Sequence, residues 1–278
     1  MRDVRRFTGL AQFGPAYRVM LENAPNAPGS VDRVLVERMV RLCPETVQWL
    51  YDEYTPTEVR YEPGSRSELE SHLPRAIAGC ADDEAKIAGI AAFCHRLQDR
   101  VTDDLDEMVV GGTEGEIIRR GSDWCTEVAR VGCVLFQLAG LPARMVYLFD
   151  MGAAYSGHAM TEAYRGGVWG AVCPHTDVIY RHPDGAPASV WELKADPELI
   201  EAHRREEGTT YTRAGQFQGA AISNYPAHEW RRYQYPVSPI NDYYRAILTK
   251  SLQGWPGGLR WIHGEDGSPP FAPCGVSG

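Results

Sequence analysis

The sequence is poor in lysine and lacks long apolar runs. Lys86, Lys194 and Lys250 are the only lysines among 28 basic residues, which leaves few amines for self-crosslinking. No stretch approaches the roughly 18 consecutive apolar residues of a membrane helix, so we expect no membrane span. The first residues have neither a continuous apolar core nor a small-residue cleavage site, so we also expect no signal peptide.

The common cofactor motifs are missing as well. The chain contains no G-x-G-x-x-G, no P-loop, no H-E-x-x-H and no internal repeat. We therefore expect no cofactor. One set of side chains has the types that zinc prefers, but its spacing matches none of the usual closed pairs, and we expect no metal there: Cys125, His158, Cys173 and His175.

Charge and cysteine usage restrict the setting. The net charge is −9 with a pI near 5.4, which argues against nucleic acid or an anionic membrane as the partner and favours a cationic or neutral substrate. Seven cysteines, an odd number without paired spacing, predict free thiols in a cytoplasmic protein. With 44% apolar and 23% charged residues, the composition is that of a globular protein with a sizeable core.

A helix followed by a strand is predicted from residue 125 onward. Apolar residues recur at the helical interval, and Gly140 with Pro142 forms a stop signal. Cys125 then lies in the first turn, where unpaired backbone N–H groups and the helix dipole favour thiolate over thiol. The same N–H groups are able to hold a developing oxyanion.

A β-hairpin is predicted next, with strands at 157–164 and 168–173 around a glycine turn. His158 and Glu162 share one face of the first strand because side chains alternate. A turn at Arg165-Gly166 would place His158 opposite Cys173. A turn at Gly166-Gly167 would place it opposite His175. In both registers these three residues lie on one side of the ribbon.

The order of these segments carries a resemblance. It consists of a cysteine at a helix start, a G-L-P-A-R segment, a histidine strand, a tryptophan and a proline at a strand end: Cys125, Gly140-Leu141-Pro142-Ala143-Arg144, His158-Ala159 with Glu162, Trp169, and Pro174. Over residues 82–180 this order resembles the transglutaminase-like branch of the papain-like cysteine enzymes. The resemblance implies an α+β fold in which the nucleophile helix packs on an antiparallel sheet. The residue patterns outside this stretch predict helical N- and C-terminal extensions.

The resemblance also implies roles for particular residues. Cys125 matches the nucleophile and His158 matches the base. Where the family has the aspartate of D-P-T, this chain has Cys173-Pro174-His175, so Cys173, His175 and Asp177 are the candidates for the third catalytic position. A further departure is Asp123, two residues before the nucleophile, where the family commonly has glycine.

The implied activity is acyl transfer through a cysteine thioester, as in a peptidase, an amidase or an amine acyltransferase. The partner would be a peptide or small molecule that contains an amide or ester, with water or an amine as acceptor and with no nucleic acid and no membrane involved. Trp124, Trp169 and Glu162 are the candidate substrate-binding residues. The alternative hypothesis is a catalytically silent binding or scaffold protein that keeps the fold.

The remaining chain is divided into a helical N-terminal region at 1–75, a catalytic core at 76–190 and a helical and aromatic extension at 191–278, expected to form one unit. A helix is predicted from about 83 to 101, with His95 off its apolar stripe as a surface histidine. The acidic stretch 102–115, including Glu114, is interpreted as a solvated loop or a rim beside Cys125. Ser238-Pro239 is interpreted as a helix start.

Overall fold

The protein is a mixed α+β structure with an antiparallel sheet. A computed structural model describes residues 39–53, 61–102, 104, 106–148, 158–207, 214–223 and 238–239. In this part of the chain, six strands form one sheet in the order β1-β7-β3-β4-β5-β6, and two short strands pair separately. The α+β class and the antiparallel sheet agree with the prediction.

The strands of the large sheet are short at its edges and longest at its centre. In chain order they are β1 (Val40–Arg41), β3 (Ala143–Leu148), β4 (His158–Arg165), β5 (Val168–Cys173), β6 (Val178–Ile179) and β7 (Ala221–Ser223). The separate pair is β2 (Val109–Val110) with β8 (Ser238–Pro239). Since β1 and β7 come from the two flanking regions, the sheet extends beyond residues 76–190.

Helices surround this sheet. The α-helices are α3 (Ser67–Glu70), α4 (Leu73–Ala76), α5 (Asp83–His95), α6 (Glu114–Arg120), α7 (Cys125–Leu138), α8 (Val190–Ala195) and α9 (Pro197–Glu207). Shorter turns are the π-helical η3 (Trp49–Glu53) and the 3₁₀ segments η4 (Gln98–Arg100) and η5 (Ala214–Gly219). None of the helices within the described ranges has the length and hydropathy that a membrane crossing requires.

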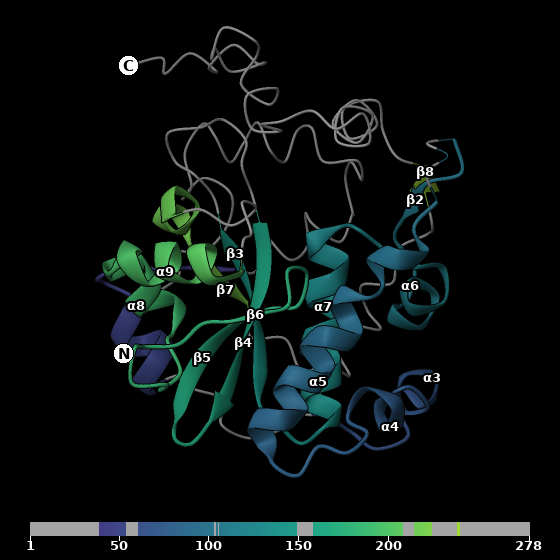
Figure 1. The fold of residues 1–278 in the computed structure, drawn as a ribbon, viewed down its shortest axis with the longest axis horizontal. Coiled ribbons are helices and arrows are strands. Elements are labelled where there is room, and N and C mark those ends of the chain that lie inside the picture. Colours follow the sequence, from purple (N-terminus) through teal and green to yellow (C-terminus); the bar gives the residue numbers. More distant parts are fainter. Residues whose placement is uncertain are drawn as a thin grey trace, which may run out of the picture.

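Two apolar cores fill the space on the two faces of the sheet. Figure 1 shows α5 and α7 on one side of the strands, and α8 and α9 on the other side. Met145 and Tyr147 of β3 pack into the core with α5 and α7, whereas Val146 and Leu148 pack into the opposite core with α8. This alternation is the period of two that a strand buried on both faces shows. The helix α7 crosses β4 and β3 and is buried along most of its length.

The sequence predicted α7 and the hairpin closely, but α5 ends earlier than expected. The helix begins after Asp82, whose side chain accepts a hydrogen bond from the Ala85 amide, and it ends at His95 instead of continuing to 101. The Leu97 carbonyl accepts from the Ser122 amide at 3.2 Å, because the segment before α7 docks there. A Cβ at Gly121 would lie 2.6 Å from that carbonyl, so this close approach requires glycine.

The helix start predicted at residue 238 is wrong. Ser238 and Pro239 pair with Val110 and Val109 in an antiparallel ladder. A Ser-Pro pair predicts a helix start from local sequence alone, and the pairing with β2, which is distant in the sequence, overrides that preference. The helices expected before residue 39 and most of the C-terminal extension lie outside the described residues.

Candidate functional site

Cys125 occupies the first position of α7 and is half-buried. Trp124, the N-cap residue, has an extended backbone (φ −85°, ψ 115°) and lacks a side-chain cap bond. Ser122 takes part of that role, because its hydroxyl accepts from the Trp124 amide at 3.1 Å. Cys125 is therefore a half-buried residue at a helix N-terminus, where the first backbone amides have no acceptor within the helix.

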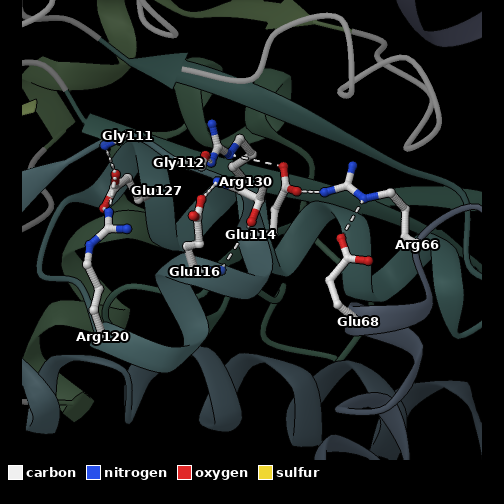
Figure 2. A network of polar contacts seen from close by, with 10 residues as sticks. Arg66, Glu68, Gly111, Gly112, Glu114, Glu116, Arg120, Glu127 and Arg130 are labelled. Atoms are coloured by element: carbon white, nitrogen blue, oxygen red, sulfur yellow. Dashed lines mark hydrogen bonds and ion pairs between the residues drawn. The ribbon is translucent and has the colours of Figure 1, made fainter. Parts of the chain in front are cut away.

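Glu127, in the same first turn, fixes the chain that leads into α7. Its buried carboxylate accepts from the Gly111 amide at 2.6 Å and from Arg120 at 2.7 Å (Figure 2). It also accepts from the Ser122 hydroxyl at 2.6 Å. Charged hydrogen bonds of this kind, made in a buried place, are among the stronger polar contacts. They hold the approach to Cys125 in one conformation.

The acidic loop before α7 differs from the expectation at Glu114. This residue is buried at 3% exposure, and its carboxylate pairs with Arg66 and Arg130 (Figure 2). Arg130 also donates to the Gly112 carbonyl at 2.7 Å, which ties the diglycine turn to α7. Glu114 is thus not a solvated residue: it follows the N-cap Thr113, whose capping box starts α6.

The hairpin turn is Gly166-Gly167, the second of the two predicted registers. β4 and β5 pair from Arg165↔Val168 to Thr161↔Val172, and β5 ends at Cys173. Pro174 follows and has no amide hydrogen to donate, which explains why the ladder stops. His158 reaches the end of β5 diagonally instead, with its Nε2 3.0 Å from the Cys173 Sγ.

The turn after β5 brings His175 to the same place. The His158 and His175 rings meet edge to face with centroids 5.8 Å apart. The His175 Nε2 lies 3.1 Å from the Asp123 Oδ1. The His175 carbonyl accepts from the His95 Nδ1 at 2.7 Å and from Gln98 at 2.5 Å. Sequence reasoning missed His95 and Gln98, because a helix end offers no signal for a bond to a distant turn.

Two contacts tie the start of α7 to the end of the sheet at which β4 begins. On one side, Asp123 contacts His175, the neighbour of His158. On the other side, the Thr126 hydroxyl lies 2.9 Å from the Tyr147 hydroxyl of β3, and Tyr147 pairs with Ala159. The start of α7 is therefore held at the end of the hairpin where His158 begins β4.

Burial sets the charge state of this cluster. Burial, and then the nearby charge of His175, lower the pKa of His158 well below its ordinary value. Burial raises the pKa of Cys173, although the Thr176 side chain and the Thr176 and His175 amides act in the opposite direction. At neutral pH the pair is therefore a neutral imidazole beside a neutral thiol.

Asp177 lies at the exposed end of the turn and has a left-handed backbone (φ 57°). Its negative charge contributes to raising the pKa of both Cys173 and Cys94, after burial as the larger cause. The charge of Asp177 therefore acts on the thiols of Cys173 and of Cys94 in α5. Among the three predicted third-position candidates, it is Cys173 whose side chain contacts the His158 ring nitrogen.

Two of the three predicted substrate-binding residues belong to the interior. Glu162 is completely buried, pairs with Arg144 at 2.7 Å and accepts from the Tyr51 hydroxyl at 2.8 Å and the Val190 amide at 2.7 Å. Trp169 is 3% exposed, with the Arg144 guanidinium 4.0 Å from its ring. These contacts join the sheet to η3 and α8. Trp124, half-buried beside Cys125, is the one at the helix start.

Among the described residues, no group of three or more His, Cys, Asp or Glu side chains is arranged to hold a metal ion. The contacts near the start of α7 join two imidazoles, one thiol and one carboxylate from three segments of the chain, and Cys125 follows two residues after that carboxylate. Compared with known proteins, the chain matches no family model, no curated protein and no solved structure.

Proposed function

We propose that the protein is a transglutaminase-like cysteine enzyme that transfers acyl groups through a thioester on Cys125. The single observation that carries this proposal is the attachment of the residues around Cys125 to the end of the sheet where β4 begins: Asp123 contacts His175, the ring neighbour of His158, and Thr126 contacts Tyr147 of β3. The packing of α7 on β4 and β3 supports the finer proposal of a papain-like core.

The chemistry begins with proton transfer. The Cys125 thiol gives its proton to neutral His158, and the sulfur bonds to the carbonyl carbon of an amide or ester. The carbonyl π electrons move to oxygen, and the amides of the first turn of α7 stabilise that oxyanion. When the carbonyl re-forms, the C–N or C–O bond breaks and the leaving amine or alcohol takes the proton from His158.

The thioester is then resolved by a second nucleophile. Water or an amine attacks the thioester carbonyl, gives its proton to His158 and forms an acid or a new amide. The C–S bond breaks, and the Cys125 sulfur regains the proton from the imidazole. A low pKa of His158 suits the first half of each step, since a base must be unprotonated to accept. The same low pKa makes the protonated His158 unstable, and a neutral Cys173 stabilises this imidazolium poorly.

A test with an activated ester addresses the proposal. p-Nitrophenyl acetate mixed with the protein should release a burst of p-nitrophenol of about one equivalent, and peptide mass spectrometry should find the acetyl group on Cys125. Cys125→Ala should abolish the burst. Cys80→Ser, which removes another half-buried thiol, should leave it unchanged. An acetyl group spread over several cysteines, with a burst that survives Cys125→Ala, would refute the proposal.

A second candidate function has an observation in its favour. His158 is only 1% exposed, and its ring nitrogen faces a thiol where the resembled family has a carboxylate. These features fit a catalytically silent binding or scaffold protein. In that case Cys125 should react with iodoacetamide like an ordinary thiol with a pKa of about 8.5, and Cys125→Ala should leave cellular phenotypes intact.

A further inference from the structure

The three positions at which the chain departs from the resembled pattern meet in space. Cys173 lies against His158, with 3.0 Å between Sγ and Nε2. His175 packs edge to face on the same ring. Asp123 lies 3.1 Å from the His175 Nε2. A carboxylate is therefore absent at residue 173 but present at residue 123, one imidazole further away.

His175 is held from both ends. Its carbonyl receives the hydrogen bonds from His95 and Gln98, which fix the turn, while Asp123 accepts at the ring through its side chain and its backbone carbonyl. The His175 side chain is 7% exposed and that of Asp123 is 44% exposed. The ring thus connects a carboxylate at the surface with the buried His158.

The proposed chemistry requires negative charge near this pair. When His158 takes the proton of Cys125, a positive charge forms in a buried place, which is unfavourable without a nearby anion. The thiol of Cys173 is a poor substitute because it is neutral. A carboxylate on the neighbouring imidazole lowers the energy of a positive charge anywhere on the two rings.

We infer that Asp123 is a positioning residue: it holds His175 against His158 and supplies, through this second imidazole, the negative charge that residue 173 lacks. The inference rests on the proposed function of Cys125. It follows that the rate of Cys125 alkylation at low pH depends on the charge of Asp123, although Asp123 does not touch the reacting atoms.

Other titratable groups lie on the elements packed around this pair. Cys173 of β5 contacts the His158 ring, and His95 of α5 contacts the His175 carbonyl. Asp177 in the turn acts on Cys173 and on Cys94 of α5, Tyr147 of β3 contacts Thr126, and Cys125 begins α7. Asp123 differs from these groups because it places a carboxylate oxygen within hydrogen-bond distance of a ring nitrogen of His175. Among the residues that the structure describes, no other carboxylate makes such a contact with His158 or His175.

The test measures the rate of Cys125 alkylation by iodoacetamide against pH, with peptide mass spectrometry to separate the cysteines. In Asp123→Asn, which keeps an acceptor oxygen but removes the charge, the rate near pH 6.5 should fall by about threefold to tenfold. The difference should vanish above about pH 9.5, where the thiol ionises without help. Asp123→Glu should recover much of the rate.

Two controls separate this effect from a structural one. Asp99→Asn, which neutralises another exposed carboxylate, should stay within about twofold of the unchanged protein at every pH. The double variant His175→Gln/Asp123→Asn should match His175→Gln alone, because the carboxylate acts through that ring. Circular dichroism and thermal unfolding verify that each variant is folded.

The outcomes distinguish the inference from the proposed function. A pH profile of Asp123→Asn that superimposes on that of the unchanged protein, a uniform rate loss at all pH values, or additive effects in the double variant would overturn the inference while Cys125 remains a nucleophile. A Cys125 that lacks enhanced reactivity in the unchanged protein would instead remove the proposed function. A rate loss in Asp123→Asn that is confined to low pH, together with a double variant that matches His175→Gln alone, supports the action of Asp123 through His175.

Discussion

Replacing Glu162 with glutamine should destabilise the protein strongly. Glu162 and Arg144 are both completely buried, and the carboxylate pairs with the guanidinium at 2.7 Å. Its other oxygen accepts from Tyr51 and from the Val190 amide, at 2.8 and 2.7 Å. Glutamine removes the charge but not the volume, so the Arg144 cation remains buried without a counter-charge.

The expected loss is about 3–5 kcal/mol of unfolding free energy, the range measured when one partner of a buried ion pair is removed. For a chain of this size the melting temperature should fall by at least about 6 °C. Lys86→Gln is the matched control. Its pair with Asp83 is exposed on α5, and removing it should change stability by less than about 1 kcal/mol.

Urea unfolding followed by circular dichroism measures both values. The experiment also decides between two roles for Glu162, because a substrate-binding carboxylate would leave stability nearly unchanged and alter reactivity. A loss below about 1 kcal/mol for Glu162→Gln, equal to that of Lys86→Gln, would refute the structural role that the contacts indicate.

Three further predictions follow from burial and close packing. Burial first, and then the second imidazole, lower the pKa of His158, so below about pH 6.5 the unfolded chain binds a proton there that the folded chain does not. Stability should therefore fall as pH decreases, by up to about 1.4 kcal/mol per unit, and His158→Gln should flatten this dependence in urea unfolding; an equal slope in both proteins contradicts it. Gly132→Ala places a Cβ 2.7 Å from the Pro174 Cγ, so overpacking of about 1–3 kcal/mol should exceed the helix gain of roughly 1 kcal/mol. Gly115→Ala places a Cβ 2.8 Å from the Cγ of Glu68, a half-exposed side chain that is able to shift, and should cost less than Gly132→Ala. A more stable Gly132→Ala protein would be inconsistent with this packing. Burial raises the pKa of Cys133 to about 12, so Ellman's reagent should not modify it in the folded protein at pH 8; rapid modification before unfolding would show that the burial is wrong.

The local elements were predictable where one pattern dominates. The helix from Cys125 to Leu138 has a clear apolar period and a glycine stop, and the hairpin has aromatic and small strands around Gly166-Gly167. Alternation along β4 was sufficient to place His158 and Glu162 on one face. It left two registers open, because both turns are compatible with the same residues.

Contacts between distant segments were not predictable. The bond from Asp123 to His175 joins positions 52 residues apart, and the strand pairing at Ser238 joins positions farther apart still. Glu114 looked solvated among other acidic residues, since its arginine partner Arg66 lies in a separate segment. Local propensity carries no information about such partners, and tertiary contacts override it.

The central claim is that an imidazole activates Cys125, and a comparison of two thiols in one protein tests it most directly. Cys125 and Cys80 are both half-buried, so Cys80 serves as the reference thiol for alkylation by iodoacetamide at pH 6.5. A thiol with a pKa of about 8.5 is roughly 1% thiolate at that pH. We predict that Cys125 reacts at least about tenfold faster than Cys80, and that His158→Gln reduces the ratio to near one. Equal rates in the unchanged protein, or a ratio that His158→Gln leaves intact, would contradict the claim.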